Sequence, residues 1–187
     1  MLFRSMKIRP LTPTDLPAAA RLYLAAAQQA YAAFYPPALL NETSWEEICA
    51  DYRSWYTWPY PPLGSVAEEQ GQLLGFGMGG RVEDDPNGQE EPGGYDSEIY
   101  KLFVHPQHQR RGIGKALLHN LLERIAATGC KRVIIWSYTQ SASTQYYQAL
   151  GGKILWQTTH NPGGAELPVC VLGWELPNLL AAVSPRS

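Results

Sequence analysis

The apolar positions of this chain repeat with the two periods that distinguish helices from strands. Apolar residues recur every four positions from Ile113 to Ile125, and this single apolar face predicts a helix over residues 112–128 that packs on a sheet. Leu102-Phe103-Val104 and Val133-Ile134-Ile135 are instead continuous apolar runs, which are typical of strands buried inside a sheet. The same patterns predict strands over residues 7–10, 65–69, 73–82, 98–104, 132–138, 153–159 and 169–176, and helices over residues 12–31, 44–56, 112–128 and 141–150.

Turn and capping residues separate these elements. Thr12-Pro13 begins the first helix and Pro36-Pro37 ends it, whereas Gly129 and Gly151-Gly152 end the last two helices. The resulting order, β-α-α-β-β-β-α-β-α-β-β, predicts a single-domain α/β fold with one mixed sheet flanked by helices. We assign residues 6–177 to this domain, residues 1–5 to an N-terminal extension and residues 178–187 to a C-terminal tail.

Composition excludes several classes of protein. The chain has 187 residues, of which 45% are hydrophobic and 17% charged, as in a globular domain that buries a full core. No apolar run approaches the length of a membrane span, and the apolar part of the N-terminus is too short for a secretory signal. The three cysteines are odd in number and lack C-x-x-C spacing. We therefore expect no metal site, no disulfide framework and a reducing, cytoplasmic location.

Charge is distributed unevenly, although the net charge is only −2. The segment from Lys101 to Arg132 holds seven basic residues and one acid, which suits a polyanionic cofactor. The segment from Val82 to Tyr100 holds seven acids and no base. Its field could attract a cationic amine, but a solvated surface loop is the interpretation that we favour. We do not expect nucleic-acid binding, because the basic segment is local and the protein is acidic overall.

The most informative stretch lies between residues 100 and 118. An apolar strand ends at His105-Pro106, five polar residues follow, and Gly112-Ile113-Gly114 opens the helix. The first N–H groups of a helix have no internal partner and carry partial positive charge, and glycine lets an anion approach the backbone. The loop is not a Walker P-loop, and Leu117 stands where a dinucleotide fingerprint needs its third glycine. An ordinary basic turn is the alternative interpretation.

Residues Gln109 to Gly114 resemble the [Arg/Gln]-x-x-Gly-x-[Gly/Ala] signature of the GNAT acyl-CoA N-acyltransferase superfamily. The preceding strand, residues 98–106, and the following helix resemble the central segment of that family. The order of elements is similar too, so the resemblance covers nearly the whole chain from Met6. It implies a GNAT-like fold whose sheet is mostly antiparallel. It also implies that the fourth and fifth strands splay apart to admit the pantetheine arm of coenzyme A.

The resemblance implies a set of cofactor contacts. The backbone N–H groups of the loop would hold the pyrophosphate, and the strand end would pair with the pantetheine amides, with the N–H of Phe103 or Val104 facing the thioester oxygen. Gln140 and Ser143 stand where the family often has Asn and Ala, and Gly152 replaces the usual Phe. The implied cofactor-binding residues are Leu102, Phe103, Val104, Gln109, Arg110, Arg111, Gly112, Ile113, Gly114, Lys115, Gln140, Ser143 and Tyr147.

The resemblance also implies catalytic roles. Tyr147, four residues before Gly151, matches the family tyrosine that is proposed to protonate the coenzyme A sulfur; an ordinary helix tyrosine is the alternative. Glu98 matches the glutamate that serves many members as a base, and a surface carboxylate is an equally good interpretation. Tyr100 lies on the same face of a regular strand as Glu98 and is the reserve candidate. A catalytic role for His105 or His108 is disfavoured.

We therefore expect an acetyl-CoA-dependent N-acetyltransferase acting by direct transfer on a primary amine, more readily of a small molecule than of a protein. The alternatives are a non-catalytic acyl-CoA-binding module, an N-terminal or lysine protein acetyltransferase, and a nucleotide-binding protein. Aromatic residues crowd the first two helices, where they could form an acceptor pocket, core packing or the surface of a homodimer. They are Tyr31, Phe34, Tyr35, Trp45, Tyr52, Trp55, Tyr56, Trp58 and Tyr60.

Overall fold

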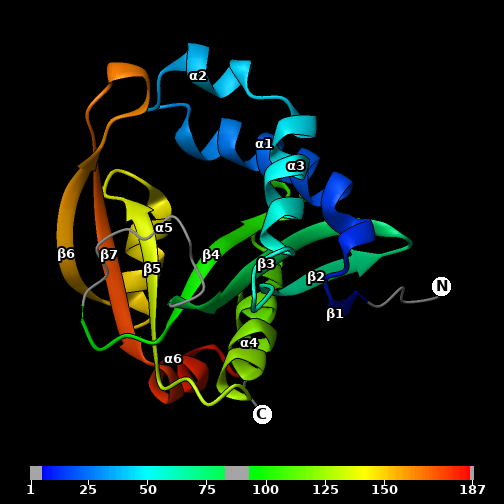
Figure 1. The fold of residues 1–187 in the computed structure, drawn as a ribbon, viewed down its shortest axis with the longest axis vertical. Helices are drawn as coiled ribbons and strands as arrows, with labels where there is room; N and C mark the ends of the chain where they lie inside the picture. The colour runs from blue at the N-terminus through cyan, green and yellow to red at the C-terminus, as the bar shows by residue number, and fades with distance from the viewer. Residues whose placement is uncertain (1–5, 83–92, 186–187) are drawn as a thin grey trace.

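A seven-stranded sheet runs through the protein, with its strands in the order β1-β2-β3-β4-β5-β7-β6 (Figure 1). The computed structural model describes residues 6–82 and 93–185. Every neighbouring pair of strands is antiparallel except β4 and β5, which run parallel. The strands are β1 (Lys7–Pro10), β2 (Leu63–Glu69), β3 (Gln72–Arg81), β4 (Ser97–Val104), β5 (Arg132–Tyr138), β6 (Lys153–His160) and β7 (Leu167–Glu175). This confirms the predicted fold class, a mixed and mostly antiparallel sheet.

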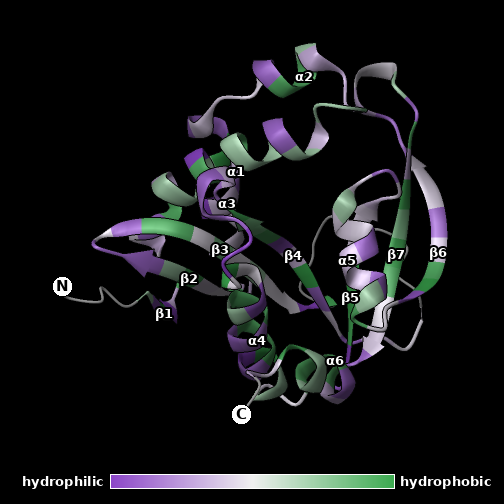
Figure 2. Ribbon diagram, turned by 180° about the vertical axis from the view of Figure 1, so that it is seen from behind, coloured by the Kyte–Doolittle hydropathy of each residue, from purple (hydrophilic) through white to green (hydrophobic). Residues whose placement is uncertain are grey.

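Helices cover both faces of the sheet and bury their apolar sides against it (Figure 2). One core cluster joins α1 and α3 to β2 and β3, and a second joins α4, α5 and α6 to β5 and β7. The α4 face that was predicted from the sequence is buried, with Leu117 and Leu121 fully enclosed. The helices are α1 (Leu16–Tyr31), α2 (Pro37–Glu42), α3 (Trp45–Trp55), α4 (Ile113–Ala126), α5 (Ala142–Ala149) and α6 (Leu176–Val183).

Two helices, α2 and α6, were not predicted. α2 has Pro37 at its first position and α6 has Pro177 at its second, where the N–H that proline lacks would have no partner within the helix. The sequence prediction took Pro36-Pro37 as the end of the first helix and ended the last strand at Leu176. Part of the segment predicted as a C-terminal tail therefore belongs to α6, and its Leu179 and Val183 are each 1% exposed within the core.

The sheet splits between β4 and β5. Their parallel pairing covers three residues, Ser97 to Ile99 against Val133 to Ile135. Beyond this point β5 continues along β7, whereas β4 continues along β3. The strand end from Lys101 to Val104 thus has no β-strand partner on the β5 side within the described residues. This divergence is the splay that the resemblance implied.

A β-bulge in β4 changes which side chains share a face. Met78 pairs with Lys101 and Gly79 pairs with Ile99, so Tyr100 is an extra residue opposite β3. Ile99 and Leu102, three positions apart, consequently both pack on α4 in the same core cluster. The other face of β4 receives Glu98 and Lys101, which regular alternation would place on opposite sides.

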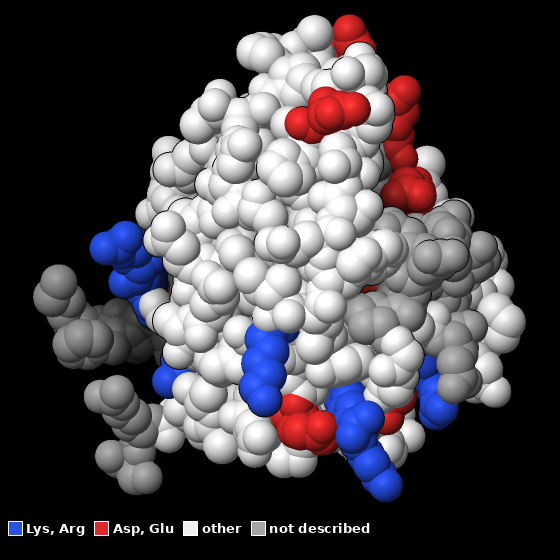
Figure 3. Space-filling model, turned by 90° about the vertical axis from the view of Figure 1, so that its left-hand side faces the viewer, with Lys and Arg blue, Asp and Glu red and all other residues white. Residues whose placement is uncertain are grey.

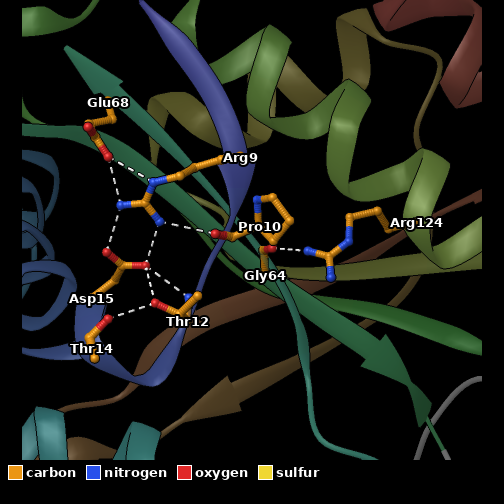
Figure 4. A network of polar contacts seen from close by, with 8 residues as sticks. All are labelled: Arg9, Pro10, Thr12, Thr14, Asp15, Gly64, Glu68 and Arg124. Carbon is orange, nitrogen blue, oxygen red and sulfur yellow. Dashed lines mark hydrogen bonds and ion pairs between the residues drawn. The ribbon is translucent and has the colours of Figure 1, made fainter.

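An ion-pair network attaches edge strand β1 to the start of α1 (Figure 4). The Arg9 guanidinium donates two hydrogen bonds to Asp15, at 2.8 and 2.9 Å, and one of 2.8 Å to Glu68 on β2. Asp15 also accepts the backbone N–H of Thr12 at 2.9 Å. These contacts, led by the Arg9 hydrogen bonds and opposed by burial, hold the pKa of Asp15 below its usual range.

Asp15→Asn is expected to lower the free energy of unfolding by about 2 kcal/mol at pH 7, because it removes a charged acceptor of bidentate hydrogen bonds. Since the pKa of Asp15 is lowered by folding, this contribution is present above the unfolded value of about 3.9 and is lost as the pH falls through the folded value. Urea unfolding at pH 7 and at pH 3 measures both effects. Glu166→Gln, at an exposed site, is the control and should change stability by less than about 0.5 kcal/mol.

Candidate functional site

A cavity of about 900 Å³ occupies the split in the sheet. It is bordered by the end of β4, by β5 and the start of α5, and by α1, α2, α3 and β6 on the far side. Leu102, Phe103 and Val104 line it, as the predicted pantetheine contact requires. The free side of this strand end can hydrogen bond to an extended ligand as an added strand would.

The predicted anion loop lies at the end of the same strand. Gly112 is the N-cap of α4 with φ of 77°, and Arg110 also has a positive φ, of 64°. Alternation of this kind directs successive backbone N–H groups to one side and forms a concave anion site. Ala116 donates the first helical hydrogen bond, to Gly112 at 3.0 Å, so the N–H groups before it have no partner within the helix.

The side chains of this loop have distinct environments. Gln109 lines the cavity and its amide donates to the Val104 carbonyl at 3.2 Å, which connects the loop to the strand end. Arg111 pairs with Glu69 at 3.3 Å and contacts His108 at 3.2 Å. Ile113 is buried, whereas Gly112 and Lys115 border a separate hollow of about 450 Å³ between α4, β1 and the end of α6.

Tyr147 lies against the cavity on α5 and is 6% exposed. Its ring packs edge-on against Trp174, with centroids 6.2 Å apart, and beside Tyr146 at 5.5 Å. Burial, followed by the nearby Tyr146, raises the pKa of Tyr147 above its ordinary value. The phenol therefore stays protonated at neutral pH and can serve as a proton donor, but it is a poor proton acceptor.

The start of α5 places two hydroxyl groups near the cavity. Ser141 is the N-cap and accepts the N–H of Ser143 at 3.3 Å, and the Ser143 hydroxyl contacts that of Ser137 at 3.1 Å. Ser143 lines the cavity. Gln140 is exposed and does not line the cavity. Of the two predicted cofactor contacts in this segment, Ser143 thus lines the cavity and Gln140 does not.

The two predicted proton acceptors both line the cavity. Glu98 is 8% exposed. The Tyr100 hydroxyl donates to the Arg81 carbonyl at 3.0 Å, and its ring packs against Trp55 and Trp58. Tyr100 is thus held by the backbone of β3, which leaves Glu98 as the stronger candidate for a base.

Aromatic residues of the first helices belong to separate groups. Tyr31, Tyr35 and Tyr52 line the cavity, whereas Trp45 stacks on Arg21 and Tyr60 is 64% exposed. The remaining predicted aromatics, Phe34, Trp55, Tyr56 and Trp58, lie outside the set that lines the cavity.

Sequence reasoning missed the aromatic contribution of β5 and β6 to the cavity. Tyr138 packs against Tyr31 with ring centroids 5.2 Å apart and hydrogen bonds to His160 at 2.9 Å. Both residues line the cavity. The alternation of Trp136 and Tyr138 along β5 was a signal that could have indicated an aromatic face.

Charged groups are mainly acidic near the wall of the cavity that α1, α2 and α3 form, which we call the acceptor side because the sequence analysis placed a possible acceptor pocket there. The segment Pro37–Trp55, which contains α2 and α3, holds four acids and one base. Figure 3 views the molecule from the side of β6: acidic side chains lie at the end that carries α2, and the lower half holds basic side chains with a few acidic ones among them. Two bases of the predicted basic segment are used elsewhere: Arg124 donates to the Gly64 carbonyl, and Arg132 pairs with Glu175 at 2.8 Å. Most of the predicted acidic loop, residues 83–92, lies outside the described residues.

Within residues 6–82 and 93–185, no cluster of three or more His, Cys, Asp and Glu side chains is arranged to hold a metal ion. None of the helices in those ranges combines the length and the apolar character that crossing a bilayer requires.

Comparisons with known proteins identify the family and support the fold. A model of the acetyltransferase (GNAT) family matches residues 24–151. The uncharacterized N-acetyltransferase YuaI of Bacillus subtilis is 25% identical over 167 residues, which cover 89% of this chain and 91% of YuaI. YncA of Salmonella typhimurium, solved with its cofactor acetyl-CoA, has a TM-score of 0.66 at 22% identity, covering 91% of this chain and 94% of YncA.

A further solved structure has the same fold. The PaiA N-acetyltransferase of Thermoplasma acidophilum, in complex with coenzyme A, has a TM-score of 0.63 at 15% identity, covering 91% of this chain and 99% of PaiA. The family match extends over most of the chain and includes the split in the sheet, the loop and α5. The chain therefore belongs to the acetyltransferase (GNAT) family and is an acyl-CoA-dependent acetyltransferase.

Proposed function

We propose that this protein transfers an acetyl group from acetyl-CoA directly to the primary amine of a small molecule. The observation that carries the proposal is that the end of β4, which has no strand partner on its β5 side, and the buried phenol of Tyr147 line one cavity, which the loop before α4 reaches through Gln109. The loop N–H groups would hold the pyrophosphate, and the strand end would hold the pantetheine arm.

Each residue has a defined task in this reaction. Glu98, directly or through water, removes a proton so that the acceptor amine is neutral when it attacks the thioester carbon. A backbone N–H of Phe103 or Val104 stabilises the negative charge that develops on the carbonyl oxygen. As the carbon–sulfur bond breaks, Tyr147 donates a proton to the leaving thiolate. No covalent enzyme intermediate is needed.

The cavity supports a small acceptor rather than a long peptide. The turn after β6 meets α2 on the far side of the split, where a Cβ on Gly163 would lie 2.9 Å from a methyl carbon of Leu39. Figure 1 shows α2 and this turn at the same end of the molecule. Tyr31 and Tyr138 are in contact beneath them. We take these contacts between the two sides of the split as support for a compact amine.

The location that we infer is the cytoplasm. All three cysteines, Cys49, Cys130 and Cys170, are free and buried. Persistent thiols of this kind support a reducing compartment.

Glu98→Gln is expected to lower kcat about tenfold at pH 7. This is less than the usual contribution of a general base, about 10²–10⁴, because amine that is already neutral in solution bypasses the base. The neutral fraction of an amine with a pKa near 10 rises about a hundredfold between pH 7 and pH 9, so the loss should shrink at pH 9. Steady-state rates of both proteins at the two pH values measure this. Tyr100→Phe is the control. If this variant, rather than Glu98→Gln, shows a loss of kcat that shrinks at pH 9, then Tyr100 is the group that removes the proton from the amine.

The test of the proposed function is calorimetric titration with acetyl-CoA and CoA, followed by a screen of amines for acceptor-dependent CoA release. Micromolar binding together with turnover of at least one small amine supports the proposal. Binding without turnover of any small amine, peptide N-terminus or peptide lysine would instead identify a non-catalytic acyl-CoA-binding module. No binding of either compound would overturn the proposal.

A further inference from the structure

Lys101 is an unexpected cation on the acceptor side of the cavity. Among the described residues that line the cavity, Asp51, Glu98 and Lys101 carry formal charges, and Lys101 is the one Lys or Arg. The sequence grouped Lys101 with the basic segment around the anion loop. The structure separates it from that loop, because its side chain lies against α1 and α3.

The bulge in β4 explains this position. Lys101 follows Glu98 by three residues, so a regular strand would direct the two side chains to opposite faces. The extra residue at Tyr100 resets the alternation, and both side chains reach the cavity. Bulges are common next to active sites, where they redirect a side chain. We therefore take the placement of Lys101 beside Glu98 as evidence about the ligand that the cavity binds.

The surroundings of Lys101 leave its charge incompletely compensated. Its ammonium lies 5.4 Å from the ring centroid of Tyr23 and 5.8 Å from that of Trp55. No carboxylate among the described residues forms an ion pair with it. Burial lowers the pKa of Lys101, while Asp51 and Glu98 oppose that change from a distance. A half-buried ammonium that has no direct anionic partner among residues 6–82 and 93–185 would be stabilised by an anion that the ligand supplies.

We propose that the acceptor is an aminocarboxylate, an amino acid in the simplest case, whose carboxylate binds Lys101 while its amine lies toward Glu98. This inference rests on the proposed N-acetyltransferase function. One cation and two carboxylates complement a molecule that carries both an ammonium and a carboxylate. A dianionic group such as a phosphate is disfavoured, because Asp51 and Glu98 would repel it more strongly than they repel a carboxylate. The rings of Tyr31, Tyr52 and Tyr138 offer apolar surface for the acceptor side chain.

The test compares amino acids with their carboxamides, which have the same size and lack the negative charge. L-tyrosine with L-tyrosinamide and L-leucine with L-leucinamide are suitable pairs, with kcat/KM measured at pH 8 and saturating acetyl-CoA and divided by the neutral fraction of each amine, because the amide lowers the pKa of the neighbouring amine. The wild-type protein is expected to prefer the amino acid of a pair by at least about tenfold, in line with a charge-assisted contact of about 1.5–3 kcal/mol.

Three variants assign this preference to Lys101. Lys101→Gln should lower kcat/KM for amino acids about tenfold, mainly by raising KM. Its kcat/KM for carboxamides should stay within about threefold of the wild-type value. Lys101→Arg, which keeps the charge, should retain most of the preference. Lys153→Gln, at an exposed position on β6, is the matched control and should leave kcat/KM unchanged for both amino acids and carboxamides. Calorimetric affinity for acetyl-CoA should be the same in all of them, which excludes misfolding as the cause.

The outcomes separate this inference from the function on which it rests. Carboxamides that react as well as amino acids, or an equal loss for both in Lys101→Gln, would overturn the aminocarboxylate acceptor and leave N-acetyl transfer intact. No turnover of any amine by a protein that binds acetyl-CoA would overturn both. A preference for amino acids that disappears in Lys101→Gln alone supports both.

Discussion

Gly112→Asp is expected to weaken acetyl-CoA binding more than a hundredfold. Gly112 is the N-cap of α4, and a Cβ there would meet no atom within 4 Å apart from those of its chain neighbours, so a side chain has room beside the first N–H groups of the helix. In the proposed site that space holds the pyrophosphate. Two like charges about 5 Å apart at an effective dielectric constant of about 20 repel by about 3 kcal/mol, which corresponds to more than a hundredfold in Kd.

Gly112→Asn is the matched control for this measurement. Asn has nearly the size of Asp and tolerates positive φ comparably, so the two variants share the backbone cost at φ of 77° and differ in charge. Calorimetry should show an affinity for Gly112→Asn within about tenfold of the wild-type value. Equal losses in both variants would mean that shape rather than charge determines binding. Unchanged affinity in Gly112→Asp would show that the loop is only a turn.

Tyr147→Phe is expected to lower kcat about a hundredfold and to change the Kd for acetyl-CoA less than threefold. The substitution removes one hydroxyl from a ring that is 6% exposed and leaves its packing against Trp174 intact. The leaving thiolate then has to take its proton from water. Stopped-time assays of acetylated product, with CoA affinity measured separately, divide the effect between turnover and binding.

The neighbouring tyrosine and the pH profile make this test specific. Tyr146→Phe alters an adjacent ring that is 39% exposed, and it should leave kcat within about twofold of wild type. Because the pKa of Tyr147 is raised, the proton donor stays protonated at pH values where an ordinary tyrosine ionises. The ratio of wild-type to Tyr147→Phe rates should therefore stay constant up to about pH 10. A ratio that collapses by pH 9, or turnover that is unchanged in Tyr147→Phe, would remove Tyr147 from the acid role.

The sequence was sufficient for the elements whose pattern is local. The apolar face of α4 is a repeated pattern, and the glycine-bearing loop before it is a short motif. Both can be read from neighbouring residues, and both lie where they were predicted. The splay between β4 and β5 came from the resemblance alone, because no periodicity encodes where two paired strands diverge. The helices α2 and α6 were missed because Pro37 and Pro177 are compatible both with a break and with a first helical turn.

The site was less predictable than the fold because its residues meet through irregularity. Lys101 reaches the acceptor side only because Tyr100 is bulged, and a single inserted residue leaves no trace in the pattern of a short strand. Tyr138 and His160 lie 22 positions apart and meet through the pairing of β5, β7 and β6, which depends on the whole sheet. Tyr147 was identified by its spacing to Gly151, a local signal.

The burial of the three cysteines bears on how catalysis can be observed. Cys49, Cys130 and Cys170 are 5%, 7% and 0% exposed, and burial raises the pKa of the Cys170 thiol. The thiolate is the reactive form toward disulfide reagents, and it must also be accessible. In the native protein, coenzyme A is therefore the readily titrated thiol, and a chromogenic disulfide can follow its release continuously. The same reagent reports unfolding, since denaturation exposes three thiols per chain.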